Sequence, residues 1–157
     1  MRHARFLLAL TLATSLSLLG IGNVRAQSAQ AAAITVSDAW IQAPPPRAPT
    51  AAGYLRLTNA GAVDDRLLSI SSPRAARIEM HEMRMDGAMM TMRPLPHGVA
   101  IPAGGAFAFS PASAHIMFTG MARPFMAGEI IPLRLVFLHA GAIETAVRVR
   151  PLSGAGR

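Results

Sequence analysis

The sequence predicts an all-β fold, arranged as a β-sandwich, on three observations. Short segments alternate between apolar and polar residues with a period of two, as strands with one buried face do. Gly, Pro, Asn and Asp separate these segments at intervals of roughly ten residues, which is typical of sandwiches and barrels. After the N-terminal segment, no long window shows the period of an amphipathic helix.

Each strand is expected where this alternation is bounded by turn residues. The segments that fit are 34–41, 53–59, 65–71, 76–83, 89–95, 106–110, 115–119, 131–138 and 143–150. Their connections contain residues that favour turns, for example "SSPR", "RMDGA", "IPAGG" and "HAGA". The proline-rich "APPPRAP" is a stiff connection within the domain, because too little chain precedes it to form another domain.

The N-terminus has the composition of a secretory signal peptide. Arg2 and Arg5 precede an apolar run, and Val24 and Ala26 are the small residues of a cleavage site. The run is short for a membrane span. We therefore expect a periplasmic protein with no stable membrane insertion after cleavage. The expected parts are a signal peptide at 1–26, a flexible lead at 27–33, one domain at 34–150 and a tail at 151–157.

Composition excludes several classes of function. The net charge is +7 and every basic residue is arginine, but the arginines are scattered and aromatic residues are few, which argues against nucleic acid as a partner. The chain has no cysteine, so it can form neither a disulfide framework nor a thiolate ligand, and it offers no cysteine for lipidation. A chain without free thiols suits an oxidising compartment.

Methionine is concentrated in one stretch, "EMHEMRMDGAMMTMRP", which holds six of the ten methionines. On a strand, His81 and Met83 would share one face. His115 and Met117 repeat the same His-x-Met pattern. Their apolar neighbours are expected to face the core: Ile78, Met80, Ile116 and Phe118. A further pair two residues apart is formed by Met90 and Met92.

Imidazoles and thioethers without thiolate are soft, neutral donors. Among first-row metal ions this set fits Cu(I) best, whereas zinc prefers thiolate, more histidine or carboxylate. A blue-copper electron-transfer centre is excluded, because it needs a cysteine ligand. Methionine is also a flexible filler of cores, so a structural role remains the alternative for each residue taken singly. Nucleophile elbows, phosphate loops and dinucleotide motifs are absent from the sequence, which does not favour an enzyme.

The stretch "HEMRMDGAMMTMRPLPHGVAIPAGGAFAFSPASAHIMFTGM" resembles the core of the periplasmic copper chaperones called PCu(A)C. Their motif is H-x10-M-x21-H-x-M. Ten residues separate His81 from Met92, 22 residues separate Met92 from His115, and Met117 completes the pattern. The upstream "DAWIQAPPPRAPTAAGYLRLTNAG" is also similar to the family's opening, so the resemblance covers nearly the whole expected domain.

The resemblance implies a cupredoxin-like β-sandwich with Cu(I) bound by His81, Met92, His115 and Met117. It implies a non-enzymatic chaperone that carries the copper ion to a client copper protein, such as the CuA centre of cytochrome c oxidase. Met83 and Met85 have no place in the motif. Two alternatives use the same residues: a periplasmic protein that sequesters copper for resistance, and a module that binds a partner protein through a methionine-rich surface.

Overall fold

The structure is a computed structural model that describes residues 34–152. The expected signal peptide and lead lie outside the described residues, as does the end of the expected tail. Residues 34–152 contain ten strands and no helix, which confirms the all-β prediction. The strands are β1 (Ile34–Gln42), β2 (Thr50–Asn59), β3 (Asp65–Ser71), β4 (Arg77–Asp86), β5 (Met89–Pro94), β6 (Val99–Ile101), β7 (Ala106–Phe109), β8 (Ala114–Thr119), β9 (Ile130–Phe137) and β10 (Ala142–Arg150). Within this range, no helix is long and apolar enough to cross a membrane.

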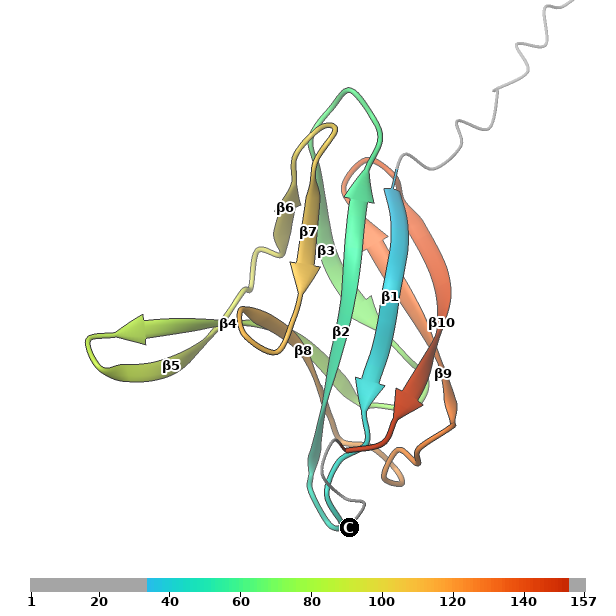
Figure 1. Cartoon of the computed structure of the whole chain (residues 1–157). Helices are drawn as coiled ribbons and strands as arrows, with labels where there is room; N and C mark the ends of the chain where they lie inside the picture. Colours follow the sequence, from blue (N-terminus) through green and yellow to red (C-terminus); the bar gives the residue numbers. More distant parts are fainter. Residues whose placement is uncertain (1–33, 153–157) are drawn as a thin grey trace, which may run out of the picture.

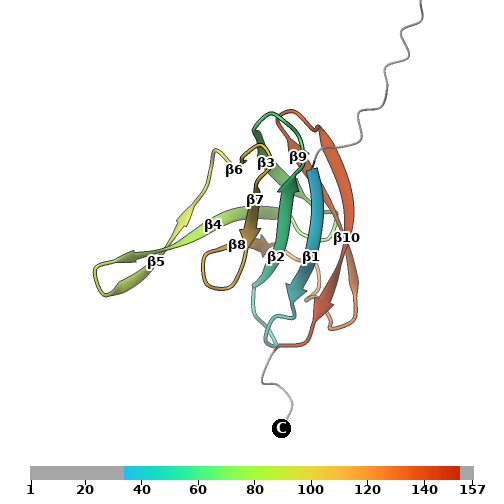
Figure 2. The same ribbon diagram turned by 45° about the horizontal axis from the view of Figure 1, so that its top comes forward.

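The strands form one hydrogen-bonded path that folds back on itself. Their order is β5-β4-β8-β2-β1-β10-β9-β3-β6, and β7 also pairs with β2. Only β1 and β10 run parallel among the pairs of the described chain. Figures 1 and 2 show β2, β1 and β10 in one layer, with β3 and β9 behind them. The two layers enclose the core.

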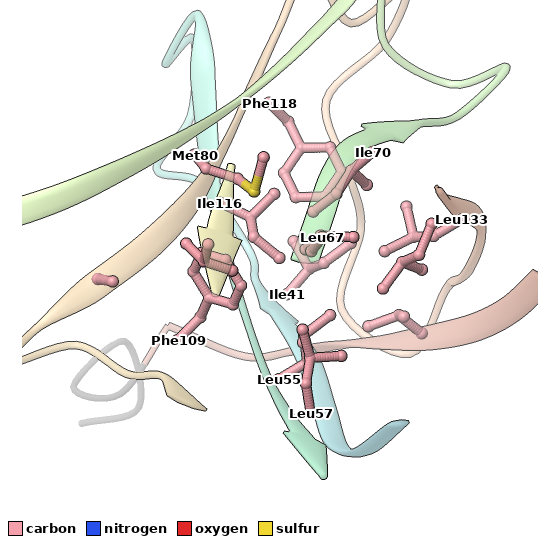
Figure 3. Close-up of a cluster of buried hydrophobic side chains, with 14 of the residues drawn as sticks. Ile41, Leu55, Leu57, Leu67, Ile70, Met80, Phe109, Ile116, Phe118 and Leu133 are labelled. Atoms are coloured by element: carbon pink, nitrogen blue, oxygen red, sulfur yellow. The ribbon is translucent and has the colours of Figure 1, made fainter. Parts of the chain in front are cut away.

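The core is built by the inward-facing residues of alternating strands. In β9, the apolar side chains Ile131, Leu133, Leu135 and Phe137 are buried, while the residues between them are partly or fully exposed. Figure 3 shows Met80, Ile116 and Phe118 packed with Leu67 and Ile70 of β3. Burying each such side chain contributes about 1.5–3 kcal/mol. The expected inward direction of Met80, Ile116 and Phe118 is confirmed, and Ile78 packs against the core while partly buried.

The structure differs most from the sequence prediction at three elements. Strand β2 begins at Thr50, three residues before the expected start at 53. A tenth strand, β6, lies between "PLPHG" and "IPAGG", where only connections were expected. Its three residues are too few to show alternation, and it exists because it pairs with β3. Strand β4 also extends to Asp86, three residues beyond the expected end, because its second half pairs with β5.

The hairpin formed by β4 and β5 projects from the body of the domain (Figure 1). Register pairs join 77–82 of β4 to β8 and 81–86 of β4 to β5, so the outer part of the hairpin pairs only with itself. Asp86 pairs with Met89, leaving a two-residue loop in which Gly87 has φ 64°. A positive φ at the first loop position is typical of a type II′ turn and favours glycine there.

Candidate functional site

Two histidines lie side by side where β4 meets β8. His81 and His115 are register partners, and their ring centroids are 5.6 Å apart at an interplanar angle of 70°. Only 8% of His81 and 9% of His115 is exposed. The Nδ1 atom of His81 is buried without a hydrogen-bond partner. Buried polar atoms nearly always have partners, so this nitrogen is available to a ligand.

The environment of His115 favours its neutral form. Burial lowers the pKa of His115 below the usual 6.5, and the positive charge of a protonated His81 lowers it further. Only a neutral imidazole has a lone pair for a metal ion. His115 is therefore prepared to ligate rather than to carry a proton.

The two methionines of the motif flank His81 on the same face of the sheet. Met117 of β8 pairs with Glu79, two residues before His81. Met92 of β5 pairs with Met83, two residues after His81. Both methionines are thus diagonal neighbours of His81, a relation that long side chains can span. They approach from opposite sides, because β4 lies between β5 and β8. Met117 is half-buried, whereas 48% of Met92 is exposed.

A packed floor lies beneath this face. Strand alternation sends Met80, Ile116 and Phe118 into the core, opposite the histidines and Met117. Phe118 packs closely against β2, where a Cβ added to Gly53 would lie 2.7 Å from the phenyl Cε2 atom. Gly53 therefore allows the ring to cover this part of β2. The packing fixes the backbone of β8 and, with it, the direction of the two ligand-type side chains.

The polar surroundings do not form a site for a hard cation. Within residues 34–152 no three His, Cys, Asp or Glu residues are grouped to hold a metal ion. Glu79 lies on the face of the site but makes an ion pair with Arg77 at 3.7 Å. The donors that share this face of the sheet are two imidazoles and thioethers, a set that suits a soft ion.

Three further methionines share this face, and the motif gave none of them a place. Strand parity puts Met83 and Met85 on the His81 side of β4, and Met83 pairs with Met92 while Met85 pairs with Met90. The sequence carries a signal for this arrangement, because the short turn at Gly87 fixes the register of the hairpin.

The other two histidines in the described part of the chain serve β3 instead. The carbonyl oxygen of His97 accepts a hydrogen bond from Arg66, and the backbone N–H of His139 donates one to Asp65. Asp65 is buried and also accepts hydrogen bonds from the backbone N–H groups of Arg66 and Ala140. These contacts hold the loops around the start of β3, and they involve no residue of the candidate site.

The amino-acid sequence of this chain matches a family model and is similar to that of another protein. The model of a family described as "LpqE-like: Putative lipoprotein LpqE-like" matches residues 34–149. A protein named putative lipoprotein Lxx21020, from Leifsonia xyli subsp. xyli, is 31% identical over 126 residues, which cover 80% of this chain and 75% of that protein.

Comparison of structures supports the same placement. The solution structure of CuI-DR1885 from Deinococcus radiodurans is 28% identical with a TM-score of 0.61, covering 80% of this chain and 85% of that one. The copper-bound PCuAC domain from PmoF2 is 18% identical with a TM-score of 0.62, covering 76% and 93%. The fold is thus a cupredoxin-like β-sandwich, as expected. With the family model matching nearly all of the described residues, the chain belongs to the LpqE-like family of PCuAC-type domains.

Proposed function

We propose that this protein is an exported, non-enzymatic carrier of Cu(I) that binds the ion through His81, His115, Met92 and Met117. It delivers copper to a copper enzyme of the cell envelope, and the CuA centre of cytochrome c oxidase is the expected client. One observation carries the proposal: two adjacent, buried imidazoles share a sheet face with thioethers from the flanking strands.

The relatives support this choice of ion. Two similar structures are those of CuI-DR1885 and of a copper-bound PCuAC domain. The donors of this chain are neutral, so a bound Cu(I) keeps its single positive charge and gains no anionic ligand that would favour Cu(II) or zinc. The name of the sequence relative, a putative lipoprotein, supports export.

The two sides of the site suit uptake and release. The histidines are almost fully buried, whereas nearly half of Met92 faces solvent. A ligand from a client protein can therefore replace the thioether of Met92 first, while the imidazoles still hold the ion. Exchange of neutral donors one at a time moves the ion without changing its oxidation state, which is what a carrier requires.

Competition against a Cu(I)-specific chelator tests the site. We expect the folded domain to retain Cu(I), and the His81→Gln/His115→Gln double variant to lose to the chelator the equivalent that the histidines hold. His97→Gln and Met126→Leu are matched controls, since they change the same residue types at positions outside the site. Retention of as much Cu(I) by the double variant as by the wild-type domain, or equal binding of zinc by the wild-type domain, would contradict the proposal.

Transfer to a client distinguishes a chaperone from a protein that sequesters copper. The copper-loaded domain is mixed with an apo CuA domain, and the copper content of each is measured after separation. A chaperone gives up its ion to the client. The reference is the same client mixed with free Cu(I) in the absence of the carrier. Retention of all copper by the carrier, while the free ion metallates the client, would favour sequestration.

A further inference from the structure

The hairpin of β4 and β5 carries a ladder of methionines beyond the four proposed ligands. Met83 pairs with Met92, and Met85 pairs with Met90. Directly opposed residues in an antiparallel pair have Cβ atoms about 4.5–5.5 Å apart, and successive rungs on one face are roughly 7 Å apart. We call these two pairs the inner rung and the outer rung. Both lie on the face that holds His81 and His115.

Packing does not explain these side chains. Met85 and Met90 are 62% and 59% exposed, and the hairpin stands clear of the body (Figures 1 and 2). The reverse face of the hairpin is charged: Arg84 pairs with Glu82 at 3.1 Å and Arg93 with Asp86 at 3.9 Å. No core lies under either face of the outer rung. Met85 and Met90 therefore contribute little burial, and their thioether chemistry remains as the reason for them.

The donor set of the ladder differs from that of the histidine site. Its two rungs offer thioethers alone, and these neutral, soft donors select a soft ion. Methionine has three rotatable bonds, so two opposed side chains can bring their sulfur atoms to one ion without moving the backbone. Met92 belongs both to the inner rung and to the proposed histidine site, which makes the ladder continuous with that site.

We propose that the two rungs form a second, all-thioether site for Cu(I), at which the ion is taken up before it passes to His81 and His115. This inference rests on the proposed function. The ion moves inward as the thioethers of Met85 and Met90 are replaced by those of Met83 and Met92, and these by the imidazoles. Copper stays Cu(I) throughout, every ligand is neutral, and no proton or electron is exchanged.

Substitution by leucine tests the proposal, because leucine keeps the apolar surface and removes the sulfur. Cu(I) and its analogue Ag(I) are titrated into the folded domain, with stoichiometry measured by metal analysis and binding followed at the methionine methyl groups by NMR. We expect two equivalents in the wild type and one in Met85→Leu/Met90→Leu. Met89→Leu is the matched control, since Met89 lies on the reverse face of the same hairpin and is 70% exposed. It should bind two equivalents.

The outcomes separate this proposal from the proposed function. The His81→Gln/His115→Gln variant should keep the equivalent bound by the ladder and lose the other. A single equivalent in the wild type that disappears in the histidine variant would leave the carrier function standing and overturn the second site. Two equivalents in Met85→Leu/Met90→Leu, or an equal loss in Met89→Leu, would also overturn it.

Discussion

Single buried polar residues in this domain have two different uses, and His115 illustrates the first. Its imidazole is buried beside the imidazole of His81. Within residues 34–152, the His115 side chain makes no hydrogen bond to the rest of the fold. Burial and the charge of His81 lower the pKa of His115. A lowered pKa keeps the ring neutral to a lower pH than that of a free histidine, so protons compete less with a metal ion.

A pH profile of Cu(I) affinity follows from this shift. Because the pKa of His115 lies below 6.5, proton competition at this residue should begin only below about pH 6.5 and grow as the pH falls. Chelator competition from pH 8 to pH 5 measures the effect. The thioethers do not titrate, so a weaker residual affinity should persist at the acid end. An affinity that stays flat across this range would mean that the histidines are not ligands.

Asp65 illustrates the second use, which is to hold the fold. Burial alone would raise the pKa of its carboxyl group, but the hydrogen bonds from the backbone N–H groups of His139, Arg66 and Ala140 outweigh burial and lower it. The folded state thus favours the carboxylate. Its stabilisation is present above the unfolded pKa of about 4 and is lost as the pH falls through the lower pKa of the folded state.

Asp65→Asn should therefore destabilise the domain at neutral pH. The amide nitrogen cannot accept the hydrogen bond from Ala140, and a lost bond to a charged group costs about 1.5–3 kcal/mol. Urea denaturation at pH 7 measures the loss, and the gap to the wild type should narrow at acid pH. Asp64→Asn is the control: Asp64 is exposed and accepts one backbone hydrogen bond, from Ala103. Equal losses in both variants would contradict the special role of Asp65.

At the scale of the elements, the space around the backbone can be compared at two glycines with positive φ. Gly87 in the hairpin turn and Gly98 before β6 both have positive φ, at 64° and 72°. A Cβ on Gly87 would meet nothing within 4 Å, whereas a Cβ on Gly98 would lie 1.9 Å from the carbonyl oxygen of Leu67. Both positions carry the same conformational demand, but only Gly98 is also a point of contact between two elements.

Gly87→Ala and Gly98→Ala should consequently differ in their cost. The left-handed conformation alone costs an L-residue about 1–2 kcal/mol. Gly98→Ala adds a backbone clash that can be relieved only by moving β6 away from β3, so we expect it to cost more, by about 1–3 kcal/mol. Chemical denaturation of the two variants gives the comparison. A Gly98→Ala variant as stable as Gly87→Ala would show that β6 is not held closely against β3.

The strands show which parts of the fold can be predicted from local pattern. The strand at Asp65–Ser71 has the bounds that alternation predicted, and the inward direction of Ile116 and Phe118 followed from the same period of two. Strand β6 was missed because three residues carry no period. The parallel pairing of β1 with β10 joins segments far apart in the chain, and no local pattern specifies it.

In the candidate site, too, some features could be predicted from the local sequence and others depended on long-range pairing. The sequence motif selected four residues and strand alternation assigned their faces. The neighbourhood of His81 and His115 depends on the register between β4 and β8, and the pairing of Met85 with Met90 depends on the register of the hairpin. The turn at Gly87 is a sequence signal for the register of the hairpin. The register between β4 and β8 is set by long-range packing, so it became known only with the structure.

At the scale of the molecule, the candidate site spans two elements that differ in how closely they pack: the hairpin of β4 and β5, and strand β8. β8 packs on the core and pairs with β2, whereas the outer hairpin pairs only with itself. Elements with few buried contacts open more readily than the core does. A metal ion held by residues of β5, β4 and β8 joins the hairpin to the body. Loading with Cu(I) should therefore affect both the stability of the whole domain and the local opening of the hairpin.

We expect Cu(I) to raise the free energy of unfolding of the domain. A ligand that binds only the folded state stabilises it by about 2.7 kcal/mol when its free concentration is 100 times the dissociation constant. Thermal unfolding under reducing conditions measures this gain, and hydrogen exchange should slow most in β4 and β5, which the ion ties to β8. The His81→Gln/His115→Gln variant is the control and should gain less. Bound copper that left the unfolding temperature unchanged would mean that the methionines hold the ion equally well in the unfolded chain, and that the folded arrangement of histidines and thioethers is not what creates the site.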